Sequence, residues 1–210
     1  MKNAAAGVIY AIAVLLFTTA LGLSVIHLTG FPYSLDVDYL KIPEMAGIPR
    51  DEVLQNYDAI MDYLSPFSDS DFSLPTLSYT KQASGHFADC KFLFNVLYIL
   101  GGLSAFILIL ISGTRMISKG SLKISGALTM AIPAFIGAAL AIDFDRAFDL
   151  FHKIFFEGAS WIFNPATDGF IRIMPSTFFM HCAVFIALFW LSGAIVQLVA
   201  GYSNNRSRRF

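Results

Sequence analysis

Two histidines each lie three residues from an aspartate, an arrangement that suits proton transfer. His86 precedes Asp89, and His152 follows Asp149, so each pair shares one face if the segment is helical. A carboxylate that accepts one imidazole N–H fixes the tautomer and raises the basicity of the other ring nitrogen. Each pair is therefore a minimal general base. Taken singly, a histidine is more often a satisfied polar residue without a task, and that alternative stays open for both.

Residues 143–156 predict the helix that carries His152. Asp145, Asp149 and His152 recur at i, i+4 and i+7 and form a polar stripe. A second, apolar stripe consists of Phe144, Phe148, Phe151 and Phe155. Such a helix suits a membrane surface, with its apolar side in lipid and its ionisable side toward a cavity or water. We interpret it as half of an active site, with Asp145 as a further supporting carboxylate.

Four long apolar runs must position these residues. The chain has 210 residues, of which 56% are hydrophobic and 21 are Phe, whereas soluble domains are nearer half apolar and lack uninterrupted runs. No Asp, Glu, Lys or Arg occurs in residues 4–29, 92–113, 124–142 or 178–202. At a rise of ~1.5 Å per residue each run can cross a hydrocarbon layer of ~30 Å. The sequence predicts an all-α membrane protein with four transmembrane helices in one domain, residues 1–210.

Charge is segregated between the two sides of this predicted bundle. All 15 acidic residues fall in two connections, ten in residues 30–91 and five in residues 143–177. The opposite side carries only bases, namely Lys2, Arg115, Lys119, Lys123, Arg206, Arg208 and Arg209. The positive-inside rule places both termini in the cytoplasm and both connections outside, where amphipathic helices cap the outer face. Cleavage of the first run as a signal peptide is the alternative, although that run is much longer than a signal h-region.

The first outer connection predicts one loop and two helices. Residues 31–49 have scattered Pro and Gly without a period and are predicted to be an extended loop. Pro49 opens a helix over residues 50–64, with acidic residues in its first turn. Ser84 is the expected N-cap of a second helix, which continues into the apolar run 92–113.

The membrane runs contain small and polar residues that suit helix packing. Gly101 and Gly102 are adjacent and allow close approach of a neighbouring helix. Gln197 has no evident charged partner and is expected to form an interhelical hydrogen bond.

Other chemistries have weaker support in the sequence. Histidines and carboxylates together can bind zinc or copper, but no pair has the spacing of a metal motif, so we predict neither a metal nor a cofactor. There is no GxSxG motif, glycine-rich phosphate loop or nucleic-acid signature. Cys90 and Cys182 both lie at outer helix ends, where a disulfide and two small buried thiols remain alternatives.

The acid–histidine segments resemble a bacterial family of four-helix membrane proteins that includes lipoprotein intramolecular transacylase. The resemblance spans nearly the whole chain in order and spacing, through residues 56–57, 61–64, 86–91, 143–145, 151–156, 161 and 164–165. Departures are Cys90, where an aliphatic residue is expected, and Ser176, where an acidic residue usually follows the proline.

The resemblance implies an acyltransferase of the bacterial cell membrane. Its substrate is expected to be a lipoprotein whose N-terminal cysteine bears a diacylglyceryl group, and the sn-2 acyl chain moves to the cysteine α-amine. His86 and His152 match the family's two functional histidines. Membrane lipid is the other expected partner. Two alternatives remain, a non-catalytic binding or accessory protein and a metal-handling protein.

Roles for the two histidines follow from this reaction. Because the amine attacks within one molecule, no protein nucleophile is needed and proximity supplies several kcal/mol. Proton transfer from an α-amine of pKa ~7.8 to a histidine of pKa ~6.5 is uphill by about 1.8 kcal/mol. We expect His86, in the first turn of its helix, to be the neutral base, and His152 to stabilise the oxyanion or reprotonate the alkoxide. The two rings must then meet in one pocket, each held by its neighbouring aspartate.

Overall fold

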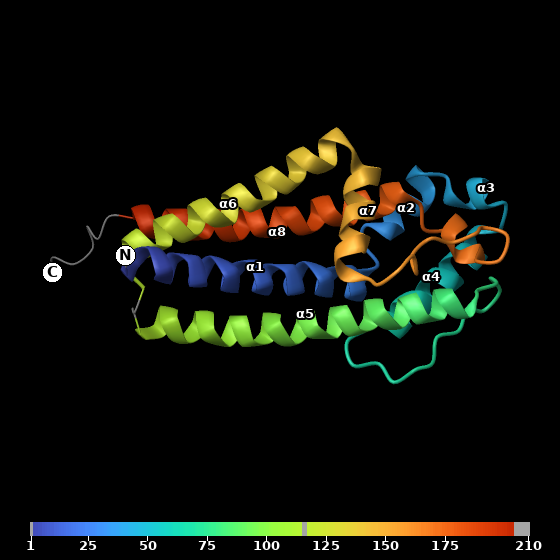
Figure 1. The fold of residues 1–210 in the computed structure, drawn as a ribbon, viewed down its shortest axis with the longest axis horizontal. Helices are drawn as coiled ribbons and strands as arrows, with labels where there is room; N and C mark the ends of the chain where they lie inside the picture. The colour runs from blue at the N-terminus through green and yellow to red at the C-terminus, as the bar shows by residue number, and fades with distance from the viewer. Residues whose placement is uncertain (1, 115–116, 204–210) are drawn as a thin grey trace. The chain divides into compact units, whose positions relative to one another are not determined.

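The computed structural model describes residues 2–114 and 117–203, and this part of the chain is entirely helical (Figure 1). Four long helices are α1 (Lys2–Thr29), α5 (Lys81–Thr114), α6 (Lys119–Ile142) and α8 (Ser176–Tyr202). The shorter elements are α2 (Tyr33–Tyr39), α3 (Ile42–Ala46), α4 (Arg50–Leu64), α7 (Phe144–Phe155) and the 3₁₀ helix η1 (Gly169–Arg172). The all-α prediction is confirmed. Of the bases that set the predicted topology, Arg115, Arg206, Arg208 and Arg209 lie outside the described residues.

The contacts divide the chain into two compact units. Unit 1 consists of Met1–Leu23, Ile99–Ala138 and Val184–Phe210, and unit 2 consists of Ser24–Tyr98 and Ala139–Ala183. Each long helix contributes residues to both units. The single membrane domain therefore stays a prediction.

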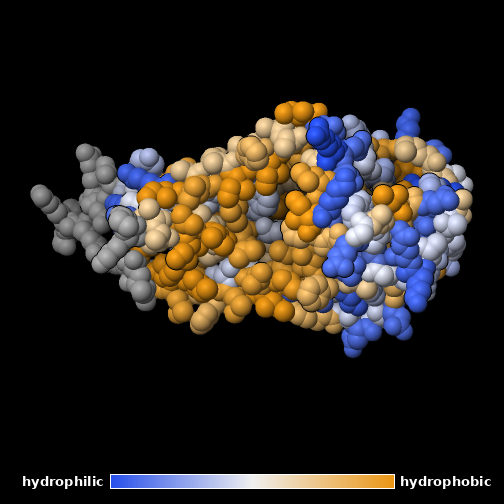
Figure 2. All heavy atoms as spheres, in the orientation of Figure 1, coloured by the Kyte–Doolittle hydropathy of each residue, from blue (hydrophilic) through white to orange (hydrophobic). Residues whose placement is uncertain are grey.

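The four long helices are each long and apolar enough to cross a membrane. Within unit 1 they run alongside one another, and the face in Figure 2 exposes mainly hydrophobic side chains there. The 34 residues of α5 extend over roughly 50 Å, more than the ~30 Å of a hydrocarbon core. We treat its apolar run, residues 92–113, as the spanning segment, and the charged residues 81–91 as lying outside it.

A buried polar cluster joins α6 and α8 within unit 1. The Ser125 hydroxyl donates to the side-chain oxygen of Gln197, whose nitrogen donates to the Thr129 hydroxyl at 3.2 Å. All three residues are buried. The predicted interhelical hydrogen bond of Gln197 is thereby confirmed, and it satisfies a polar side chain inside an apolar bundle.

Unit 2 corrects the predicted loop at residues 31–49, which forms α2 and α3 instead. Helices of seven and five residues are too short to show a clear period in sequence. Tyr33, Val37 and Ile42 are fully buried in the core of this unit, so tertiary packing stabilises the two helices. Gly47 ends α3 in the left-handed region, at φ 69°.

The helix predicted over residues 50–64 is confirmed as α4, and the start of α5 is corrected. The Thr80 hydroxyl accepts the Ala83 N–H at 3.2 Å, and α5 begins at Lys81. Thr80 is therefore the N-cap, whereas Ser84 lies inside the helix and donates to the Lys81 carbonyl at 3.1 Å. As a result, His86 lies in the second turn of α5, where the helix dipole acts weakly.

The two adjacent glycines of α5 test the packing of unit 1. A Cβ on Gly101 would collide with the Cβ of Ala20 on α1, whereas a Cβ on Gly102 would have open space. We expect Gly101→Ala to destabilise the protein by about 1–3 kcal/mol through overpacking. Gly102→Ala is the matched control, and its stability should be unchanged or slightly higher because alanine favours helix by up to ~1 kcal/mol. Thermal unfolding in detergent would contradict this packing if Gly101→Ala were the more stable variant.

Candidate active site

The two predicted histidines lie side by side in unit 2. The ring centroids of His86 on α5 and His152 on α7 are 5.8 Å apart, with an interplanar angle of 31°. Their exposed fractions are only 7% and 8%. The structure thus brings together two imidazoles that are 66 positions apart in the sequence and shields both from water.

Aromatic rings enclose this pair of imidazoles. Phe156 contacts both of them, with centroid distances of 4.7 Å to His86 and 5.4 Å to His152. Phe163 lies 5.5 Å from His86, and Trp161 lies 5.6 Å from His152. Such a lining excludes water and lowers the local dielectric constant, which disfavours a charged imidazole and strengthens any hydrogen bond made inside.

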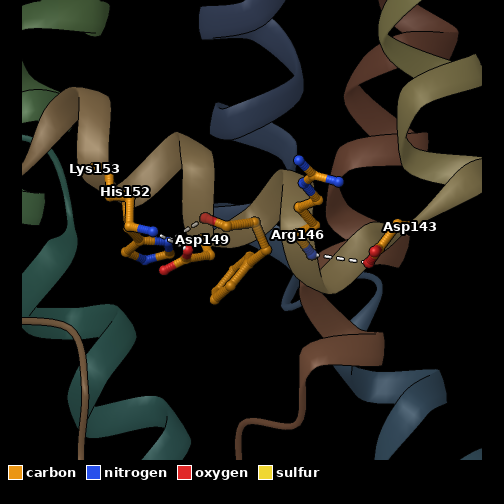
Figure 3. Close-up of polar contacts among 6 residues, drawn as sticks. Asp143, Arg146, Asp149, His152 and Lys153 are labelled. Atoms are coloured by element: carbon orange, nitrogen blue, oxygen red, sulfur yellow. Dashed lines mark hydrogen bonds and ion pairs between the residues drawn. The ribbon is translucent and has the colours of Figure 1, made fainter.

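In α7, His152 shares its inward face with phenylalanines, whereas the sequence analysis placed it on a separate polar stripe with Asp145 and Asp149. Phe148, His152 and Phe156 recur every four residues and face the site, and the Phe148 ring lies 4.2 Å from the His152 ring. Beside this stripe, four apolar side chains of the helix are exposed, namely Leu150, Phe151, Ile154 and Phe155. Asp143 is the N-cap of this helix, because its carboxylate accepts the Arg146 N–H at 3.0 Å (Figure 3).

A backbone carbonyl, and not a carboxylate, holds His152. Its Nδ1 lies 2.7 Å from the carbonyl oxygen of Phe148 (Figure 3). A carbonyl only accepts, so Nδ1 carries the proton and the neutral ring has its lone pair on Nε2. The predicted bond to Asp149 is wrong, since that carboxylate accepts from the Lys153 ammonium at 2.5 Å.

Asp149 still acts on His152 through its charge. Burial lowers the pKa of His152, while the Phe148 carbonyl and the Asp149 charge partly oppose that shift. Lys153 in turn keeps the pKa of Asp149 below its usual value. Asp145 is exposed and forms no described hydrogen bond to either histidine, so the structure leaves it outside the site.

His86 also lacks its predicted carboxylate partner. Asp89 is exposed, and no hydrogen bond joins it to His86 in the described part of the chain. Instead, Nε2 of His86 lies 3.5 Å from Sγ of Cys90, and its buried Nδ1 has no partner among the described residues. Burial, reinforced by the nearby His152, lowers the pKa of His86 to about 4. The expected neutral form is therefore favoured, but by burial and not by the helix dipole.

Hydrogen bonds from the start of α5 hold the segment that follows α7. The side-chain nitrogen of Gln82 lies 3.2, 3.4 and 3.0 Å from the carbonyl oxygens of Ala159, Ser160 and Ile162. Nearby, the Asp168 carboxylate accepts the Thr80 N–H at 2.8 Å. These contacts fix residues 159–168 against α5 and so place Trp161 and Phe163 around the imidazoles.

The carboxylate–imidazole contact that the structure does form involves residues that the sequence did not single out. Nδ1 of His181 on α8 lies 2.8 and 2.9 Å from the two carboxylate oxygens of the buried Asp36 on α2. Their separation of 145 positions gave no sequence signal. Within the described ranges, no three His, Cys, Asp or Glu side chains come together to hold a metal ion, and Cys90 and Cys182 are both free thiols.

Comparisons with known proteins point to one family of membrane proteins. A family model described as lipoprotein intramolecular transacylase Lit matches residues 8–179. The solved structure of Lit from Bacillus cereus is similar, with a TM-score of 0.85 and 29% identity, covering 95% of this chain and 94% of that one. Another structure of the same protein, with a histidine replaced by arginine, gives a TM-score of 0.73 at 28% identity over 95% and 90% of the two chains.

A curated relative is an uncharacterised protein of Aquifex aeolicus, 28% identical over 129 residues. The match covers 59% of this chain and 56% of that protein, so it spans little more than half of the relative's length.

Burial of His86 predicts a dependence of stability on pH. Between pH 6.5 and about 4 the unfolded chain binds a proton at this residue and the folded protein does not. The free energy of unfolding therefore falls as the pH is lowered, by about 2 kcal/mol between about pH 7.5 and about pH 5 for this group. Chemical unfolding of wild type and His86→Gln at both pH values measures it. The wild type should lose about that much more stability than the variant, and parallel losses would contradict the burial of a neutral ring.

Proposed function

The chain belongs to the lipoprotein intramolecular transacylase family, a family of membrane acyltransferases, and we propose that it moves the sn-2 acyl chain of a diacylglyceryl-cysteine to the cysteine α-amine. The amine nitrogen forms a bond to the ester carbonyl carbon, and the bond from that carbon to the glycerol oxygen breaks. The proton lost by nitrogen ends on the glycerol oxygen, so the products are an amide and a free hydroxyl. The observation that carries this proposal is the enclosed pair of imidazoles, His86 and His152.

The hydrogen bonds of the two rings support roles opposite to those expected from the sequence. His152 donates from Nδ1 to the Phe148 carbonyl, which leaves Nε2 as a lone-pair acceptor. We assign it as the base that takes the proton from the attacking nitrogen and passes it to the alkoxide. His86 then acts as the neutral N–H donor to the oxyanion, in an enclosure where such a donor is strong.

The lowered pKa of His86 argues against its use as the base. Transfer from an α-ammonium of pKa ~7.8 to a ring of pKa about 4 is uphill by roughly 5 kcal/mol, against about 1.8 kcal/mol for an ordinary histidine. A nitrogen that has already attacked the carbonyl is a stronger acid than the free ammonium. Proton removal therefore belongs to the step after attack, and free amine is the attacking form.

The surroundings of the site suit a lipid-anchored substrate at the extracytoplasmic face. The exposed apolar side of α7 (Leu150, Phe151, Ile154 and Phe155) can lie in lipid, so the acyl chains of the substrate need not leave the bilayer. All 15 acidic residues fall within the residue ranges of unit 2, which is the charge pattern of an outer surface. Diacylglyceryl-modified lipoproteins and membrane lipid are thus the proposed partners.

Replacement of either histidine tests the catalytic assignment. We expect wild type to convert a diacylglyceryl lipopeptide in vesicles to the lyso form. His86→Ala and His152→Ala should each slow that conversion by about 10²–10⁴-fold, because each removes a proton-transfer or oxyanion group. Mass spectrometry of the lipopeptide N-terminus measures the transferred acyl chain.

Asp145→Asn is the matched control, since Asp145 lies on α7 outside the site, and its rate should stay within about twofold of wild type. An unchanged diacyl substrate with wild type would reject the transacylase assignment and favour a non-catalytic accessory protein. Lyso product at the wild-type rate from both alanine variants would reject the assignment of the histidines.

A further inference from the structure

Cys90 lies one helical turn after His86 on α5 and contacts its imidazole. Its Sγ is 3.5 Å from Nε2 of His86, a distance at which a thiol forms a hydrogen bond to nitrogen. The thiol is partly buried and free of any disulfide. This residue is also one of the two places where the chain departs from the expected family pattern, which has an aliphatic side chain here.

The direction of the hydrogen bond follows from the acidity of the partners. Burial raises the pKa of the Cys90 thiol to about 12, so the sulfur keeps its proton. A neutral imidazole has one N–H and one lone pair, and that lone pair is a much better acceptor than a thiol sulfur. The stable arrangement is S–H donating to Nε2, which leaves the ring proton of His86 on Nδ1.

Nδ1 of His86 is the atom that the structure leaves buried without a partner among the described residues. A buried N–H that lacks an acceptor is destabilising, and a substrate oxygen that accepts from it would remove that penalty. We propose that Cys90 is a positioning residue that holds His86 in the Nδ1–H tautomer, so that this N–H is ready to donate to the oxyanion. The inference rests on the proposed transacylase function and adds the residue that sets one of its two roles.

The same contact could instead serve an alternative mechanism, in which His86 activates Cys90 as a nucleophile. That reaction requires proton transfer from sulfur to Nε2, attack of the thiolate on the ester, loss of the glycerol alkoxide, and then attack of the amine on the thioester. The raised pKa of the thiol and the aromatic enclosure both oppose the thiolate–imidazolium pair that begins this sequence. S-acylated Cys90 in trapped enzyme would therefore overturn the proposal.

The test compares variants of Cys90 that keep or remove the donor in the full-length protein. Cys90→Ser keeps an O–H donor, whereas Cys90→Val fills similar space without one. Cys182→Val is the matched control, because Cys182 is the other partly buried free thiol, lies on α8 and forms no described hydrogen bond to His86 or His152. Each variant is assayed with a diacylglyceryl lipopeptide in vesicles, and ¹⁵N-histidine NMR reports the tautomer of His86 without substrate.

We expect Cys90→Val to lower kcat about three- to tenfold with KM unchanged, the size expected from loss of one hydrogen bond, and to mix the two His86 tautomers. Cys90→Ser should restore both the wild-type tautomer and a rate within about twofold of wild type. An unchanged kcat and tautomer in Cys90→Val would overturn the proposal while leaving the transacylase function intact. A wild-type protein without acyl transfer would reject the function instead, and the NMR spectra would still decide whether Cys90 sets the tautomer.

Discussion

Two imidazoles whose centroids lie 5.8 Å apart inside an aromatic enclosure disfavour a positive charge on each other, and the rest of the site depends on this constraint. Burial lowers the pKa of each ring, and His152 adds to the shift of His86. Because both rings are neutral, only their tautomers can make one ring a proton acceptor and the other a hydrogen-bond donor. The Phe148 carbonyl selects one tautomer of His152 through a contact inside α7. One fold thus provides an acceptor and a donor from the same residue type without any buried carboxylate beside them.

The transmembrane helices and α7 could be predicted because their information is local. Apolar runs without charge define the spans, and Asp143 marks the start of α7 through a cap that needs no tertiary partner. The α2 and α3 helices could not be predicted, since they are too short for a period and depend on burial of Tyr33, Val37 and Ile42. The packing glycine of α5 could not be predicted either. The sequence shows two adjacent glycines, but only the fold shows that Gly101, and not Gly102, faces α1.

Sequence identified both imidazoles of the site but assigned them the wrong partners. An aspartate at helical spacing is a plausible acceptor, yet Lys153 at i+4 competes for Asp149, and the Phe148 carbonyl is closer to His152. Cys90 and Phe148 were within reach of the same spacing argument, because each lies four residues from its histidine. Phe163 was not, since its place beside His86 depends on the fold of the chain between α7 and α8.

The contacts of Gln82 have a consequence for how a bulky lipid reaches an enclosed site. They are neutral and exposed to solvent, and the two N–H groups of Gln82 share three carbonyl oxygens, so together they contribute only about 1–2 kcal/mol and can be exchanged for water at little net cost. Further along the segment that carries Trp161, Phe163 packs against Phe170, and Phe170 contacts Phe87 in the aromatic core. A two-chain lipid therefore meets less resistance at the Trp161 edge of the enclosure, where hydrogen bonds exchange with water, than at the Phe163 edge, where it would have to disrupt packed rings.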